Sequence, residues 1–412
     1  MHLLLFDQQD NWTQLLPLTF TRPVAALRIG ILTIVDKWVL YAKEAGHQTF
    51  GYLAFPFLSS LYPTNVNREE KLLVAGYALP NPTLWQAILA LEPEQQLWHN
   101  DTPLAWRTNL EVTDALVNSF PRPALEDGIV QYDQELILID NPTDIFALNG
   151  AQIRHDYALI TKGRVSAGIA DPHTIVYGAE NVFVEDGASI KASIINAEDG
   201  PVYIGKGAQI QEGSVVKGPF ALCDNAVVNM SAKIKGDTTI GPYCKVGGEV
   251  SNTVFQAFSN KGHDGFLGNS VIGAWCNLGA DTNSSNLKNN YQQVSIFSYA
   301  SNSQRNTGRL FCGLIMGDHS KAGINTMFNT GTVVGVGCNI FGGGFPAKHL
   351  EPFTWGGLQD GYSHYKINKL IETERMVMAR RSLDLTPEYE AMMRFLHTYI
   401  HDHAKPIRDL GQ

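Results

Sequence analysis

The sequence has few cysteines and no long hydrophobic run. Its five cysteines are widely spaced and form no C-x-x-C pair, so neither a disulfide framework nor a structural zinc site is expected. No stretch approaches the roughly 18 to 20 apolar residues that a membrane-spanning helix needs, and the apolar start ends at Asp7. We therefore expect no signal peptide, no membrane partner and a cytoplasmic location.

Positive charge is scarce as well. Lys and Arg total 31 against 40 for Asp and Glu, which gives a formal net charge of -9. Binding to a phosphate backbone needs a clustered excess of cations, so no nucleic-acid partner is expected. The 44% hydrophobic content is typical of a globular protein, and 412 residues allow two or three domains.

What the sequence does contain is an internal repeat. Aliphatic residues occupy every sixth position through residues 204–246, whereas a helix repeats near 3.6 and a strand near 2. Period six is typical of a left-handed parallel β-helix, in which each hexapeptide forms one short strand and three complete a coil. Coils stacked about 4.8 Å apart then enclose an aliphatic interior.

The repeat changes phase twice. It resumes at residues 266–278 and again at 316–340. We interpret both changes as insertions, at about 247–265 and about 279–315. Because loops that leave a rigid repeat scaffold often carry binding groups, the chemistry is expected there.

Two regions with other sequence patterns flank the repeat. Residues 1–154 alternate between strand and helix patterns, which predicts an α/β domain with a mainly parallel sheet. The expected strands are 3–6 and 71–75, and the expected helices are 27–45 and 83–91.

Residues 155–355 form the predicted β-helix, and residues 356–412 form a predicted helical tail. Apolar residues at helical spacing follow Thr386 as the expected N-cap and Pro387 in the first turn. This helix is expected to pack on a neighbouring surface, either at the end of the solenoid or between subunits, and no chemistry is assigned to it.

One segment of the repeat places a histidine between glycines. His263 lies in Gly-His-Asp-Gly-Phe-Leu-Gly, and Asn277 begins Asn-Leu-Gly-Ala-Asp-Thr. Attack of an amine on a thioester needs a base, donors for the oxyanion, and cations for any phosphate. His263 could equally be a structural histidine on a loop, and His319 has two interpretations, substrate contact or structural packing.

These segments resemble the acetyltransferase half of the GlmU-like enzymes, a bifunctional hexapeptide-repeat family of UDP-N-acetylglucosamine diphosphorylases and glucosamine-1-phosphate acetyltransferases. The resemblance implies that His263 is the catalytic base, that acetyl-CoA is the donor and glucosamine 1-phosphate the acceptor, and that the protein is a homotrimer. Candidate substrate-binding residues are Lys261, Phe266, Asn277, Asn286, Lys288, Arg309 and Lys321. Solvated surface charge is the alternative for the cations among them.

The first domain carries a second resemblance. Residues 16–23, Leu-Pro-Leu-Thr-Phe-Thr-Arg-Pro, resemble a segment of sugar-phosphate nucleotidyltransferases, in which cations and a glycine-rich loop hold the triphosphate. That loop is absent, because the first glycine of the chain is Gly30. The resemblance implies uridylyl transfer from UTP with Mg²⁺, and nucleotide-site roles for Arg22, Arg28 and Lys37. Fold-stabilising salt bridges are the alternative for these three cations.

Asp101 is a further candidate of the first domain, either as a magnesium ligand or as a turn residue. A zinc-dependent carbonic anhydrase is not expected, since neither His263 nor His319 has a histidine close by in the sequence. Three functions stay open. They are a bifunctional enzyme that makes UDP-N-acetylglucosamine, an acyltransferase with a degenerate sugar-nucleotide-binding or assembly domain, and a non-catalytic trimeric scaffold.

Overall fold

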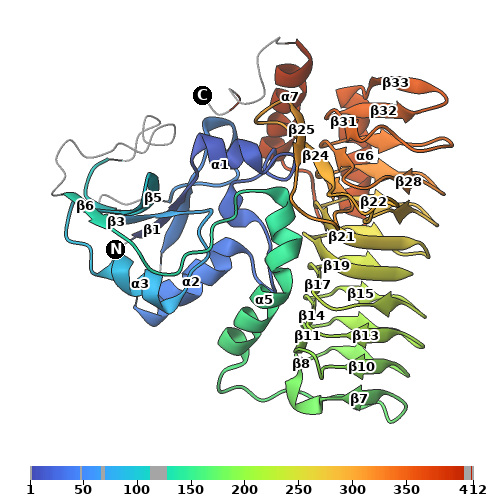
Figure 1. The fold of residues 1–412 in the computed structure, drawn as a ribbon, viewed down its shortest axis with the longest axis horizontal. Helices are drawn as coiled ribbons and strands as arrows, with labels where there is room; N and C mark the ends of the chain where they lie inside the picture. The colour runs from blue at the N-terminus through green and yellow to red at the C-terminus, as the bar shows by residue number, and fades with distance from the viewer. Residues whose placement is uncertain (1, 47–48, 66–69, 112–127, 403–409, 411–412) are drawn as a thin grey trace.

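The computed structural model describes all residues except 1, 47–48, 66–69, 112–127, 403–409 and 411–412. An α/β region forms one side of the molecule, a long parallel β-solenoid forms the other, and two C-terminal helices lie at one end of the solenoid (Figure 1). The three-part architecture predicted from the sequence is confirmed.

The first region contains a six-stranded sheet with the order β2-β1-β3-β5-β4-β6. Strand β1 runs parallel to β2 and β3, whereas β5 runs antiparallel to β3 and β4. The strands are β1 (His2–Phe6), β2 (Phe50–Leu53), β3 (Lys71–Ala75), β4 (Gln96–His99), β5 (Thr102–Thr108) and β6 (Ile129–Gln131). The two strands expected here, at 3–6 and 71–75, are therefore present.

The helices of this region differ from the expectation at one point. Helix α2 begins at Ile34, not at residue 27, because Thr33 caps it. The Thr33 side chain accepts a hydrogen bond from the Asp36 backbone N–H, and the Asp36 side chain accepts one in return from the Thr33 N–H. The elements are α1 (Gln9–Gln14), η1 (Val24–Ala26), α2 (Ile34–Glu44), η2 (Pro56–Leu58) and α3 (Pro82–Leu89).

Helix α5 (Pro142–Thr161) joins the two main parts. It begins with a second capping box, formed by Asn141 and Asp144. The helix runs along the solenoid and contacts strands β14, β17, β19 and β21 (Figure 1). It continues through position 154, where the domain boundary was expected, and the first solenoid strand follows at Ile175.

The β-solenoid has about ten turns and spans residues 175–356. Its first half contains β7 (Ile175–Tyr177), η4 (Ala179–Asn181), β8 (Val182–Val184), β9 (Ser189–Ile190), β10 (Ile194–Asn196), β11 (Val202–Ile204), β12 (Gln209–Ile210), β13 (Val215–Lys217), β14 (Phe220–Leu222), β15 (Val227–Val228), β16 (Lys233–Ile234), β17 (Thr238–Ile240) and β18 (Lys245–Val246). Its second half contains β19 (Glu249–Phe255), β20 (Asn260–Lys261), β21 (Phe266–Ile272), β22 (Asn277–Leu278), β23 (Asn283–Ser284), β26 (Ile315–Met316), β27 (Lys321–Ala322), β28 (Met327–Phe328), β29 (Val333–Val334), β30 (Asn339–Ile340), β31 (His349–Leu350) and β32 (Thr354–Gly357), after which β33 (Gly361–His364) pairs antiparallel with β32.

The first phase change is not an insertion, which corrects the expectation for residues 247–265. Val228 pairs with Val246, 18 residues later, but Val246 pairs with Lys261, only 15 residues later. The coil is therefore shortened, and its residues stay in the wall of the solenoid as β19 and β20. A pattern of inward residues reports a change of phase, but it cannot distinguish an added loop from a missing corner.

The second phase change is a true insertion. It carries the antiparallel hairpin of β24 (Ser295–Ser298) and β25 (Ser303–Asn306). This hairpin packs on the first domain, where the Phe20 and Tyr299 rings meet edge to face at 5.4 Å. The insertion therefore serves an interface between the two parts of the chain.

Helices α6 (Ile367–Ala379) and α7 (Pro387–Asp402) complete the chain. The expected cap of α7 is present, since the Tyr389 N–H donates to the Thr386 hydroxyl at 3.3 Å. Helix α7 contacts η2 of the first domain, with the rings of Phe57 and Phe395 stacked at 5.4 Å. Among the residues described, no helix combines the length and the apolar character needed to cross a bilayer.

Candidate functional site

One face of the solenoid carries a ladder of polar side chains. The parallel pairing of β18, β20, β22 and β27 aligns Lys245 with Asn260, Asn260 with Asn277, and Asn277 with Lys321. Each of these residues precedes the inward residue of its strand, and successive side chains of a strand alternate between faces, so all four point outward. Two lysines and two amides therefore lie one above the other.

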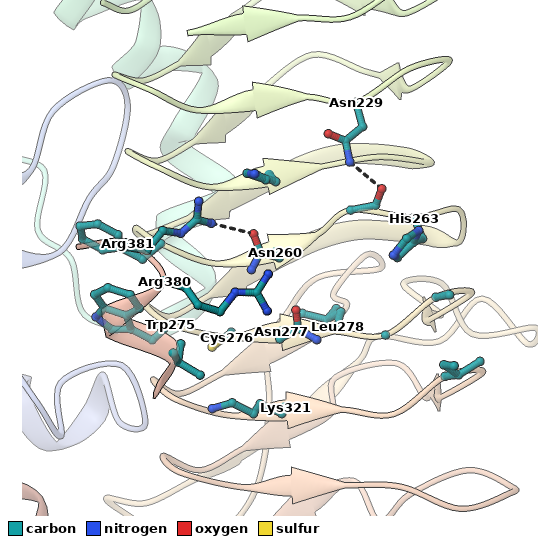
Figure 2. A pocket seen from close by; sticks show the side chains of 17 residues that line it. Asn229, Asn260, His263, Trp275, Cys276, Asn277, Leu278, Lys321, Arg380 and Arg381 are labelled. Atoms are coloured by element: carbon teal, nitrogen blue, oxygen red, sulfur yellow. Dashed lines mark hydrogen bonds between the residues drawn. The ribbon is translucent and has the colours of Figure 1, made fainter. Parts of the chain in front are cut away.

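This face is the floor of a cavity of about 740 Å³. His263 lies at one end of it, and Arg380 and Arg381, just after helix α6, lie at the other (Figure 2). The Arg381 guanidinium donates to the Asn260 side chain at 3.1 Å, which fixes the end of α6 over the floor. The C-terminal helices thus close one side of the cavity.

Four cations make the lining of the cavity positively charged. Lys245, Lys321, Arg380 and Arg381 all line it. Lys321 forms an ion pair with Glu374 of α6. Burial opposes the negative charge of Glu374, but His319 and Lys321 outweigh it and hold the pKa of Glu374 below its usual value. Such a set of cations is suited to phosphate or carboxylate groups.

The turn that carries His263 joins β20 to β21, and its imidazole is exposed. Gly265 has a φ of +116°, and a Cβ at this position would lie 2.3 Å from the Thr282 carbonyl oxygen, so the turn requires glycine. The Asn229 side chain donates to the Gly262 carbonyl at 2.7 Å. The turn is therefore held closely against the neighbouring coils.

A second cavity, of about 680 Å³, also adjoins this turn. It shares Asn229, Gly262, His263 and Ala280 with the first cavity, and Asp264 and Asp281 line it. His263 thus lines both cavities.

The structure brings only part of the predicted site together. His263, Asn277 and Lys321 line the first cavity, whereas its described lining does not include the other predicted substrate-binding residues. The Phe266 N–H donates to Asn283, the Asn286 amide donates to Asn269, the Lys288 ammonium donates to the Gln293 carbonyl, and Arg309 pairs with Asp144 of α5.

Lys261 was expected to contact a phosphate, but it lies in the solenoid interior with 1% of its surface exposed. A phosphate contact is therefore not proposed for it. His319 is fully buried as well, with its imidazole 2.5 Å from Glu374 and 2.8 Å from the Tyr389 hydroxyl. Structural packing against the C-terminal helices, the second interpretation given above, describes what His319 does here.

Sequence reasoning missed five charged or amide side chains of the cavity, those of Asn229, Lys245, Asn260, Arg380 and Arg381. Lys245 could have been found, because it directly precedes an inward aliphatic residue, as Asn277 and Lys321 do. Asn229 occupies a corner of the coil, where polar residues are common. Arg380 and Arg381 carried no signal, since their segment was assigned to packing alone.

The three cations expected to bind a nucleotide all contact other parts of the fold. Lys37 is fully buried and forms an ion pair with Asp156 of α5. Burial lowers the pKa of Lys37, although Asp156 opposes the shift. Arg22 forms an ion pair with Asp318 of the solenoid. The Arg28 guanidinium donates to the Gln256 carbonyl of the solenoid at 3.3 Å.

The described residues offer no metal site made of protein side chains alone. They contain no group of three or more His, Cys, Asp or Glu side chains that could hold a metal ion. Asp101 is exposed in the turn between β4 and β5. We therefore assign no metal ligand and derive no step that uses a metal.

Comparisons with known proteins agree with the two-part architecture. Residues 3–165 match the family model described as sugar nucleotidyl transferase. The chain is 22% identical over 316 residues to a bifunctional sugar-1-phosphate nucleotidylyltransferase/acetyltransferase of Sulfurisphaera tokodaii. This match covers 76% of this chain and 69% of that protein. This chain is also 27% identical over 194 residues to the bifunctional protein GlmU of Wigglesworthia glossinidia brevipalpis. That match covers 47% of this chain and 35% of that protein.

Among solved structures, AntD, an N-acyltransferase from Bacillus cereus crystallised with dTDP-4-amino-4,6-dideoxyglucose and coenzyme A, is 13% identical. The match covers 53% of this chain and 93% of that one, with a TM-score of 0.23. The UDP-N-acetylglucosamine acyltransferase from Campylobacter jejuni is 17% identical, with 57% and 85% covered and a TM-score of 0.23.

Proposed function

We propose that this chain, which is GlmU-like in its family match and its relatives, transfers an acetyl group from acetyl-CoA to the amine of an amino-sugar phosphate such as glucosamine 1-phosphate. One observation carries the proposal. A single cavity has the exposed imidazole of His263 at one end and Arg380 and Arg381 at the other, and Lys245 and Lys321 also line it. An imidazole is suited to general-base catalysis, and the cations are suited to phosphate groups of the substrates.

The chemistry follows from this arrangement. The acceptor nitrogen attacks the thioester carbonyl carbon, and a C–N bond forms while His263 takes the proton that the nitrogen loses. The oxyanion then collapses, the C–S bond breaks, and the thiolate of coenzyme A leaves and takes up a proton. Asn277, exposed on the cavity floor, offers an amide N–H for the oxyanion.

The first domain supports a second activity. The family match over residues 3–165 favours uridylyl transfer to N-acetylglucosamine 1-phosphate, which would make UDP-N-acetylglucosamine. The alternative is an acyltransferase whose first domain binds a sugar nucleotide or assists assembly without catalysis. The buried ion pairs of Arg22 and Lys37 favour this alternative, because they leave neither cation for a triphosphate. For assembly we propose a homotrimer, since flat prism faces can pack around a threefold axis.

An assay of both half-reactions tests the proposal. The purified chain is given glucosamine 1-phosphate, acetyl-CoA and UTP, and released thiol and pyrophosphate are measured separately. Thiol with pyrophosphate supports the bifunctional enzyme, and thiol alone supports the acyltransferase with a non-catalytic first domain. Release of neither product would contradict both enzyme hypotheses and support the non-catalytic scaffold.

A further inference from the structure

Lys261 occupies an unusual place in the solenoid. It pairs with Val246 in the column that also contains Ile210 and Val228, all of which point inward. A charged group in an apolar interior is costly unless it is hydrogen-bonded. A position that breaks the local rule of a fold is a good place to look for function.

The ammonium group of Lys261 reaches the turn that carries His263. It donates to the His263 carbonyl at 2.9 Å and to the Gly247 carbonyl of the preceding coil at 3.2 Å. Burial lowers the pKa of Lys261 to about 8. Together with the Asn229 amide on the Gly262 carbonyl, it holds two consecutive carbonyls of the turn.

We infer that Lys261 is a positioning residue, which fixes the turn between β20 and β21 so that the His263 imidazole stays at the junction of the two cavities that share it. It acts through the backbone of His263 and not on the substrates, because neither cavity includes it in its described lining. The catalytic consequence rests on the function proposed above. The holding of the turn does not, and it can be measured separately.

The test compares three variants of the full chain. Lys261→Met keeps the length of the side chain but removes its N–H donors, and Lys261→Arg keeps donors at a similar volume. Ile340→Ala is the matched control, because Ile340 is an inward residue at 1% exposure on β30, away from the turn. Hydrogen exchange of residues 259–266 is followed by mass spectrometry, and thiol release gives kcat and the KM for acetyl-CoA.

We expect Lys261→Met to speed exchange in residues 259–266 and to lower kcat by about 10- to 100-fold, with little change in KM, because a small displacement of a catalytic group is costly. Lys261→Arg should restore most of both quantities. Ile340→Ala should lower thermal stability but leave the exchange of the turn and kcat near the wild-type values.

Either of two results for Lys261→Met would overturn the inference. One is a rate of hydrogen exchange in residues 259–266 equal to that of the wild type, and the other is a kcat equal to that of the wild type. Should Lys261→Arg fail to fold, Asn229→Leu tests the same holding at the neighbouring carbonyl. A wild-type chain that releases no thiol would defeat the proposed function, yet the exchange data would still decide whether Lys261 holds the turn.

Discussion

Two groups of cations in this molecule have opposite surroundings. Arg22, Arg28 and Lys37 of the first domain lie in a sequence segment that resembles a nucleotide site, and each contacts α5 or the solenoid. The second group, which we call the cavity cations, consists of Lys245, Lys321, Arg380 and Arg381. Only Lys321 of these four was predicted from the sequence, and all four line the cavity.

The difference shows what a sequence resemblance can and cannot transfer. An ion pair in a buried site commits the cation to the fold, and removing one partner leaves an uncompensated charge. A cation on a cavity wall can offer N–H donors to a ligand even where one of its contacts serves the fold, as in the ion pair of Lys321 with Glu374. Residue type and spacing predict neither outcome, because both depend on what the chain brings opposite the charge.

The largest expected effect sharpens the role of the cavity. His263→Ala should lower kcat for acetyl transfer by about 100- to 10,000-fold, because general-base catalysis contributes about that much. Thiol release measures it. His173→Ala, at an exposed histidine just before β7, is the control and should keep full activity. A folded His263→Ala variant with the wild-type rate would remove the proposed base.

The next largest effect concerns the buried ion pair of Lys37 with Asp156. Lys37→Met should lower the free energy of unfolding by about 3 to 5 kcal/mol, because it leaves the buried carboxylate of Asp156 without its cation. Urea unfolding measures it, with Lys162→Met at the exposed end of α5 as the control. If Lys37→Met kept the wild-type stability but no longer bound UTP, Lys37 would be a nucleotide-binding residue and not a fold-stabilising one.

A third prediction concerns pH. The pKa of Lys261 is lowered from 10.5 to about 8 in the folded chain. Between these values the unfolded chain binds the extra proton, so stability rises as the pH increases from 8 toward 10.5. The gain should be about 3 kcal/mol. Denaturant unfolding of the wild type and of Lys261→Met isolates it, and the same pH dependence in both would refute the shift.

The smallest effect concerns the cavity cations. The double variant Arg380→Gln, Arg381→Gln should raise the KM for acetyl-CoA by about tenfold with little change in kcat, and added salt should shrink the difference. Arg375→Gln, on helix α6 just before these two residues but paired with Glu390 at the surface, is the control. Equal KM values for the double variant and the control would place the donor phosphates elsewhere.

The fold could be predicted from the sequence because its signal is local and repeated. Inward residues such as Ile210, Val228 and Val246 recur at a constant interval, and each occurrence supports the others. The shortened coil at Lys261 was wrongly predicted to be an insertion, since the spacing alone does not say whether residues were added or lost.

The candidate site could be predicted only where its residues lie on the repeat itself. His263, Asn277 and Lys321 were identified there, and Lys245 follows the same rule. Arg380 and Arg381 reach the cavity only through the packing of α6, which Arg381 secures on Asn260. Such a long-range contact leaves no trace in the spacing of residues along the chain.

A crystal structure of the full chain with coenzyme A bound tests the central claim most directly. The account predicts that the phosphates of coenzyme A lie within hydrogen-bond distance of the cavity cations and that its sulfur points toward His263. Coenzyme A bound away from this cavity, or with its phosphates against Arg22 and Arg28 of the first domain, would contradict it.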